Sequence, residues 1–236
     1  MLRFLLLALT ALSTLVAAPK KITGDGKITA IQKTLAPFTR IKATGIGEIV
    51  VSKGTSHELN IKAESNILPY LKTEVKDDTL HIGIEEDVSL NSREPITFFV
   101  SATDINYVRL YGANNLTFVK NTKFDKLELR ADGAHLIEGK QLKAQELSVS
   151  IFGNITMELD GEVDILKIES QGTSSINLEE LKTKEAYIES QGVENIELNV
   201  QDFLKVRTLG VSNVTYKGNP KVKSWMSFTS SLRAVN

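Results

Sequence analysis

Residues 166–178 read LKIESQGTSSINL, and residues 187–198 read YIESQGVENIEL. Both stretches place alternating apolar residues around a glycine, and the same pattern occurs four more times between residues 108 and 216. The glycines of the six units are separated by 21, 20, 19, 20 and 18 residues. They are Gly112, Gly133, Gly153, Gly172, Gly192 and Gly210. A period of about 20 residues with two short strands is typical of a β-solenoid, in which one unit cannot bury its apolar face alone. We therefore predict an all-β fold, a right-handed parallel β-helix with about 20 residues per coil and an irregular N-terminal cap.

Aligning the units on the glycine separates expected core positions from expected surface positions. The fourth residue before each glycine and the fourth residue after it are apolar in every unit, as with Ile168 and Ile176. Side chains alternate between the two faces of a strand, so such columns form a continuous core when the units stack. A sharp corner often requires a positive φ, which glycine accepts without steric cost. We therefore interpret the six glycines as structural corners.

Two carboxylates form the nearest approach to a catalytic pair. Glu169 and Glu189 both stand three residues before a glycine, so stacking would place them about 4.8 Å apart on neighbouring strands. They could bind a cation or act as an acid and base. They could also be a solvated ladder with the side chains splayed apart. The second interpretation is favoured, because rows of charges usually face water, and the pair is retained only as a candidate exposed carboxylate pair.

The first residues resemble a secretory signal peptide. Arg3 precedes an apolar stretch from Phe4 to Val16, and Ala17-Ala18 supplies the small residues before cleavage. We predict a signal peptide over residues 1–17 and export to the periplasm, the outer membrane or the medium. The apolar stretch is too short for an ordinary membrane span, so no transmembrane span is expected in the mature chain. The chain contains no cysteine, which excludes disulfides and thiol chemistry.

The remaining chain is predicted to form one domain. Residues 18–36 are polar and are expected to be a flexible N-terminal lead. The single β-solenoid domain then covers residues 37–236. It consists of irregular first coils or a cap at 37–105, regular repeats at 106–218 and a C-terminal cap at 219–236. Within these parts, residues 85–95 are expected to be a projecting loop, and Trp225 is expected to cover the end of the core.

No recognised catalytic or cofactor motif accompanies the repeat. The histidines, His57, His81 and His135, lie in separate segments without metal-ligand spacing, and each is expected to be a half-exposed strand or turn residue. There is no Gly-x-Ser-x-Gly elbow, phosphate loop or dinucleotide fingerprint. We therefore expect no catalytic residue, no cofactor and no metal. A net charge of −1 argues against a nucleic-acid partner.

Four segments in order carry a resemblance to a known family. They are FTRIKATGIGEIVVSKG at 38–54, ESNILPYLKTEVKDDTLHIGIEE at 64–86, the repeated unit, and YKGNPKV at 216–222. Together they resemble the putative auto-transporter adhesin, head GIN domain family over about residues 36–224. The resemblance implies an exported bacterial β-solenoid of largely unassigned function. The adhesin label implies surface binding, and no catalytic residues come with it.

These observations leave three classes of function open. The favoured hypothesis is an exported, non-enzymatic binding or adhesion module that presents one face to a polysaccharide or a cell-surface protein. A polysaccharide lyase or glycosidase on a β-helix is the enzymatic alternative. A structural envelope protein that assembles through the solenoid ends, and so forms a homo-oligomer, is the third.

Overall fold

The computed structural model describes residues 18–235, and the predicted signal peptide lies outside them. The prediction of an all-β chain is confirmed, because the helical structure in this range is one short 3-10 turn, Leu68–Tyr70. No helix among these residues has the length and apolar character needed to span a membrane. The strands are β1 Lys20–Thr23, β2 Ile28–Thr34, β3 Arg40–Lys53, β4 Glu58–Glu64, β5 Leu71–Lys76, β6 Thr79–Ile84, β7 Val88–Asn91, β8 Thr97–Ala102, β9 Tyr107–Phe118, β10 Lys123–Thr208, β11 Val211–Lys217, β12 Lys221–Trp225 and β13 Ser231–Ala234.

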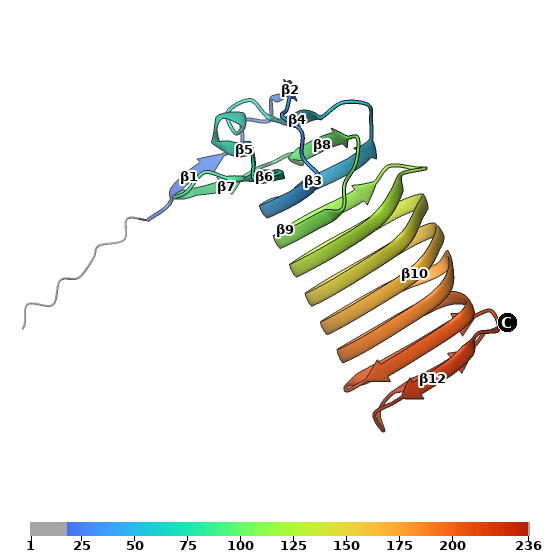
Figure 1. Ribbon diagram of the computed structural model, residues 1–236. Coiled ribbons are helices and arrows are strands. Elements are labelled where there is room, and N and C mark those ends of the chain that lie inside the picture. Colours follow the sequence, from blue (N-terminus) through green and yellow to red (C-terminus); the bar gives the residue numbers. More distant parts are fainter. Residues whose placement is uncertain (1–17, 236) are drawn as a thin grey trace, which may run out of the picture.

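The repeated part of the chain forms parallel strands in register. β9 pairs with β3 and β10, and β11 pairs with β10, always in parallel. β10 is one continuous strand with local corners of positive φ, as at Gln141, and it passes through several turns that lie one above the other (Figure 1). The two apolar columns, four residues before and four residues after the glycines, are buried in every unit. We call residues 107–217 the repeat stack, and its interior is the core of the molecule.

A row of glycines runs through the repeat stack. In register order they are Gly45, Gly112, Gly133, Gly153, Gly172, Gly192 and Gly210, and each one after Gly45 lies against the backbone of the one before it. A Cβ at Gly153 would lie 2.2 Å from the carbonyl oxygen of Gly133, and one at Gly192 would lie 2.1 Å from that of Gly172. The first five glycines also have positive φ, but Gly192 and Gly210 do not. The close approach of the backbones therefore requires glycine throughout the row, whatever the local φ.

The N-terminal part makes the sheet mixed rather than purely parallel. β4 pairs antiparallel with both β2 and β8, and β5 pairs antiparallel with β6. The blue and teal strands of this part cover one end of the repeat stack (Figure 1). Antiparallel hairpins end a stack of parallel turns because they occupy the hydrogen-bonding edge that another turn would otherwise use.

Two segments expected to be irregular are strands. The expected flexible lead at 18–36 contributes β1 and β2, and the expected projecting loop at 85–95 contributes β7, which pairs with β1. The buried Glu64 holds this region together. It accepts hydrogen bonds from the hydroxyl of Ser92 and from the N–H groups of Gly26 and Arg93. Burial alone would raise the pKa of Glu64, but these hydrogen bonds outweigh burial and leave the pKa below its usual range.

Two aromatic side chains also differ from the expectation. Trp225 does not cover the core, because its strand position faces outward and 57% of the residue is exposed. His135 is buried rather than half-exposed, and its Nδ1 lies 3.3 Å from the N–H of Asn114 in the neighbouring turn. Both differences follow from the strand pairing, which fixes the face on which each side chain lies.

The close approach at the glycine row gives a direct test. Gly192→Ala adds a methyl group against a backbone carbonyl without any change in φ preference, so we expect a loss of about 3 kcal/mol and a melting temperature about 6–12 °C lower. Gly83→Ala is the matched control, because its Cβ would meet nothing closer than 3.7 Å. Its melting temperature should change by no more than about 2 °C. Equal melting temperatures for the two variants would show that the backbones do not approach as described.

Candidate functional site

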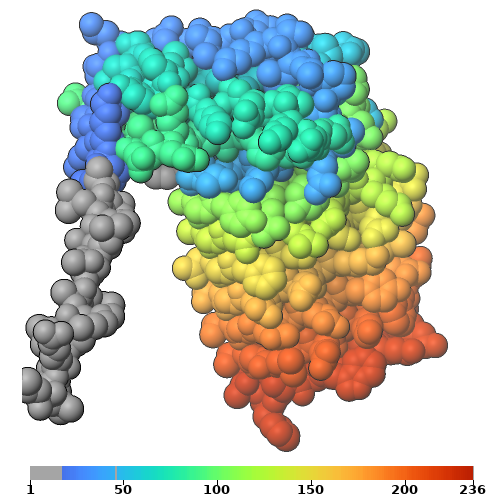
Figure 2. All heavy atoms as spheres, turned by 60° about the vertical axis from the view of Figure 1, so that its left-hand side comes forward, coloured from blue at the N-terminus to red at the C-terminus, as the bar shows by residue number. Residues whose placement is uncertain are grey.

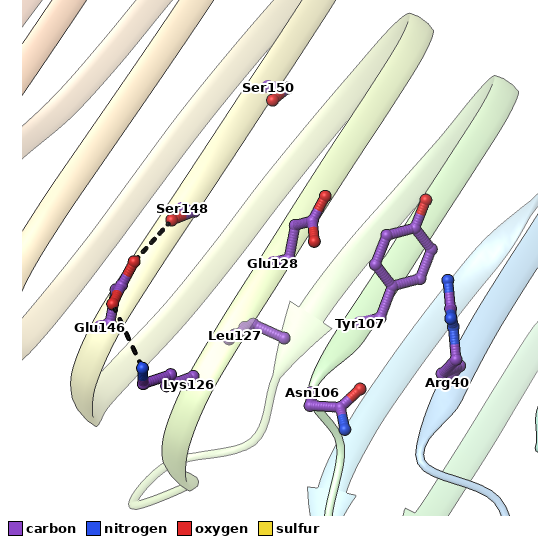
Figure 3. Close-up of a pocket in the computed structure, with 9 residues that line it drawn as sticks. All are labelled: Arg40, Asn106, Tyr107, Lys126, Leu127, Glu128, Glu146, Ser148 and Ser150. Carbon is purple, nitrogen blue, oxygen red and sulfur yellow. Dashed lines mark hydrogen bonds and ion pairs between the residues drawn. The ribbon is translucent and has the colours of Figure 1, made fainter.

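A groove of about 510 Å³ crosses the face made by the strand segments that precede the glycines (Figure 3). We call it the Tyr107 groove. It extends over β3, β9 and the first two turns of β10. Its lining residues are Arg40, Asn106, Tyr107, Lys126, Leu127, Glu128, Glu146, Ser148 and Ser150.

The parallel register places three different side chains in one row. Arg40 pairs with Tyr107, and Tyr107 pairs with Glu128, so all three project from the same face of neighbouring strands. Figure 3 shows the ring of Tyr107 between the other two side chains. The guanidinium carbon of Arg40 lies 4.3 Å from the centre of this ring, a distance that allows a cation–π interaction. The row therefore offers a cation, a phenol and a carboxylate to a ligand that lies across the strands.

Most of the charges in the groove are paired. Glu146 forms ion pairs with Lys167 and Lys126, and the hydrogen bond from Lys167, with support from Lys126, lowers the pKa of Glu146 below its usual range. Glu128 pairs with Arg130 at 2.6 Å. None of the ion pairs within residues 18–235 includes Arg40, and this residue is exposed. The groove therefore keeps one unpaired positive charge beside the hydroxyl groups of the neighbouring turns.

Glu169 and Glu189 lie on the same face but outside this groove. Gly192 lies directly over Gly172, so the two glutamates, three residues earlier, occupy neighbouring turns. Both are exposed, and the next outward side chains, Gln171 and Gln191, hydrogen-bond at 3.3 Å. The pair therefore stays a prediction, without a lining that would enclose a ligand. Within the described part of the chain, no three His, Asp or Glu side chains gather closely enough to hold a metal ion.

A second groove of about 510 Å³ lies on the strand segments that follow the glycines. Phe118, Gly139 and Leu159 contribute apolar surface to it. Four carboxylates and two lysines also line it, namely Glu138, Glu158, Asp160, Glu180, Lys120 and Lys140. No arginine lines this second groove, whereas Arg40 lies against the ring of Tyr107 in the first one. We therefore treat the Tyr107 groove as the candidate site.

The interior of the repeat stack holds a second buried carboxylate, Glu194. Only 4% of it is exposed, and neither carboxylate oxygen has a hydrogen-bond partner at standard geometry. Ser170, Ser190 and Ser212 occupy the same interior corner on its own and neighbouring turns. Burial raises the pKa of Glu194, and the nearby hydroxyls of Ser190 and Ser170 only partly oppose this shift.

The residues of the Tyr107 groove are not among the candidate site residues that the sequence predicts. When the repeat units are aligned on their glycines, the fifth residue before each glycine forms one column, and this column contains several residues of the groove. That column begins with Arg40, Tyr107, Glu128 and Ser148 when Gly45 is included. The four residues differ in type, and only the register shows that they form one row.

Residues 37–220 match the model of the family described as "Putative auto-transporter adhesin, head GIN domain". A comparison with curated proteins gives no match.

Several solved structures have a similar fold. A structure described as a putative adhesin from Bacteroides fragilis has a TM-score of 0.81 and 21% identity, and the alignment covers 91% of this chain and 100% of that one. One described as a putative lipid binding protein from Parabacteroides distasonis has a TM-score of 0.76 and 18% identity, with 92% and 100% covered. A putative adhesin from Parabacteroides merdae has a TM-score of 0.66 and 19% identity, with 92% and 100% covered.

The raised pKa of Glu194 predicts a defined pH dependence. A carboxyl with a raised folded-state pKa binds its proton more tightly in the folded state, so its contribution to stability is present at low pH and is lost as pH rises through the folded pKa. Glu194→Gln should therefore match the wild type near pH 4. At pH 8 it should melt about 2–4 °C higher, which corresponds to about 1 kcal/mol. A variant that is less stable than the wild type at both pH values would contradict this prediction.

Proposed function

Because the chain belongs to the family described as "Putative auto-transporter adhesin, head GIN domain", we propose that it is an exported, non-enzymatic module that binds an acidic polysaccharide in the Tyr107 groove. The apolar stretch at residues 4–16 and the alanines that follow it support export. The similar structures described as adhesins and as a lipid binding protein support a binding role.

The unpaired charge of Arg40 is the observation that carries this proposal. Planar guanidinium groups bind carboxylates through two parallel hydrogen bonds, so Arg40 fits the carboxylate of a uronic acid unit. The hydroxyls of Tyr107, Ser148 and Ser150 can donate to or accept from the hydroxyl groups of neighbouring sugar units. The groove is open and crosses several turns, which suits a long polymer better than a small molecule.

The charges of the groove favour binding over hydrolysis. A glycosidase needs a carboxylic acid with a raised pKa that protonates the leaving group. The hydrogen bond from Lys167 shifts the pKa of Glu146 in the opposite direction, which keeps this carboxylate ionised. A lyase or glycosidase therefore remains the less favoured alternative.

The winding of the repeat stack is a further part of this proposal. We infer that the repeat stack winds as a right-handed parallel β-helix. Parallel pairing of residues one unit apart and the glycine row support this description. Nearly all connections between parallel strands of one sheet are right-handed, which favours that hand.

The charge of Arg40 gives the first test. Arg40→Gln should weaken binding to a uronic acid polymer about tenfold to a hundredfold, because a hydrogen bond to a charged group contributes about 1.5–3 kcal/mol. Affinity electrophoresis with polygalacturonate, and with neutral dextran as the reference polymer, measures the effect. Arg93→Gln removes an equal charge from an exposed site outside the groove and should leave binding unchanged. Equal weakening by both variants, or retardation by dextran, would reject the proposal. Shortening of the polymer on incubation would favour the enzymatic alternative.

Two tyrosines at equivalent positions give the second test. Tyr107 and Tyr187 both stand five residues before a glycine and are both half-buried, but only Tyr107 lines the groove. Tyr107→Ala should weaken binding of the same polymer about tenfold, as expected for the loss of a contacting aromatic side chain. Tyr187→Ala should change stability but not affinity. If Tyr187→Ala weakens binding as much as Tyr107→Ala does, the site lies elsewhere on this face.

A further inference from the structure

The C-terminal end of the chain differs sharply in charge from the rest. The whole chain carries 28 basic and 29 acidic residues, but no acidic residue occurs after Asp202. Six basic residues follow it, namely Lys205, Arg207, Lys217, Lys221, Lys223 and Arg233. Lys217 is ion-paired with Glu179 and Glu180 of the preceding strand segments. The other five have no ion-pair partner among residues 18–235, so they leave an excess of positive charge at this end.

Strand pairing gathers these basic residues at one end of the molecule. β12 pairs in parallel with the end of β10, which places Lys223 beside Lys205 and Trp225 beside Arg207. The ammonium group of Lys205 lies 5.8 Å from the centre of the Trp225 ring. β13 pairs with β11 and places Arg233 beside Thr215. The basic residues therefore lie both on strand segments before the glycine row and on strand segments after it, in the strands that are red in Figure 1.

Exposed apolar side chains occupy the same end. Phe228 is fully exposed, and Leu209, Trp225 and Val211 are 59%, 57% and 51% exposed. In Figure 2 part of the red C-terminal segment forms a projection beyond the stacked turns. Burying large aromatic and aliphatic groups is strongly favourable, so a set of them at a projecting end indicates an interaction surface.

The loop that carries Phe228 is held in place by hydrogen bonds. The hydroxyls of Ser227, Thr229 and Ser230 all lie within hydrogen-bond distance of the carbonyl oxygen of Gly210, at 2.5, 2.8 and 2.9 Å. These three polar side chains turn inward, and Phe228 between them turns to solvent. The exposure of Phe228 is therefore built into the loop.

We infer that this C-terminal end docks on an anionic lipid bilayer, with Phe228 and Trp225 in the interfacial region and the surrounding lysines and arginines at the lipid phosphates. Aromatic rings concentrate at membrane–water interfaces, and basic residues near an anionic surface each contribute about 1 kcal/mol. An anionic bilayer can bind both the basic residues and the exposed apolar side chains of this end. A soluble acidic polymer would satisfy the charge but leave Phe228 and Leu209 in water.

A second copy of the chain is the weaker candidate for this surface. Two identical cationic ends repel each other, and the lysines of β12 protect its free edge against pairing with another strand. The inference does not depend on the Tyr107 groove, whose residues lie between positions 40 and 150.

The sole tryptophan of the chain makes the docking observable. Trp225 emission should shift to shorter wavelength when the purified protein is mixed with vesicles of equimolar phosphatidylcholine and phosphatidylglycerol. Vesicles of phosphatidylcholine alone should give no shift. The shift should weaken as salt rises above physiological ionic strength, about 0.15 M, because the charges are then screened. Cosedimentation with the same vesicles gives the partition coefficient.

Two pairs of variants separate the contribution of the basic residues to vesicle binding from that of Phe228. Lys205→Gln with Lys223→Gln should lower the partition coefficient about 25-fold, since each charge contributes about fivefold. Lys182→Gln with Lys184→Gln removes the same charge from exposed sites elsewhere and should have no such effect. Phe228→Ser should lower the coefficient about tenfold, and Phe99→Ser, at an exposed site in the N-terminal part, should not.

Three results would overturn the inference. The first is an unchanged Trp225 emission spectrum with anionic vesicles. The second is equal binding to soluble dextran sulfate without dependence on Phe228, which would indicate a polyanion site. The third is a Phe228-dependent dimer in sedimentation velocity without vesicles, which would assign this end to a second copy. Loss of polysaccharide binding in Arg40→Gln with unchanged vesicle binding would show that the two surfaces act independently.

Discussion

Neighbouring backbones approach each other closely along the glycine row, and this approach sets the register of the whole repeat stack. A Cβ at any glycine from Gly133 to Gly210 would come within about 2.2 Å of the carbonyl oxygen of the preceding glycine. Because no side chain fits there, each turn must place a glycine at the same point, and this fixes the register of neighbouring turns. The fixed register then stacks the apolar columns into one core and places every outward side chain beside its equivalent in the next unit.

The same register brings chemical groups together on the surface without any regular spacing of those groups along the chain. Arg40, Tyr107 and Glu128 are separated by 67 and 21 residues, but they lie on neighbouring strands. Charges along this face largely neutralise one another, as Glu146 does between two lysines. Arg40 near one end and the basic residues after Asp202 at the other end give the molecule two surfaces of different character. An elongated stack can keep such surfaces far apart because each turn contacts only its neighbours.

Two buried glutamates show how their surroundings decide the state of a carboxylate. Glu64 receives hydrogen bonds from a hydroxyl and two backbone N–H groups, which more than offset burial and lower its pKa. Glu194 is buried among serines, its oxygens have no partner at standard geometry, and its pKa is raised. Glu64 therefore stabilises the N-terminal strands as an anion. The surroundings of Glu194 in the repeat stack instead favour its protonated form over the ionised one.

The all-β class, the unit of about 20 residues and the buried apolar columns could be predicted from the sequence, because they follow from local alternation and a repeated glycine. The sequence did not show which strands and side chains cover the two ends of the repeat stack. The lead at 18–36 looked irregular, yet β2 pairs with β4, and Trp225 looked like a cover for the core, yet it faces solvent. It also did not identify the Tyr107 groove, whose members differ in type and come from separate units. These features depend on the pairing of distant strands, which sets which edges are covered and which side chains become neighbours, and the local pattern does not contain that pairing.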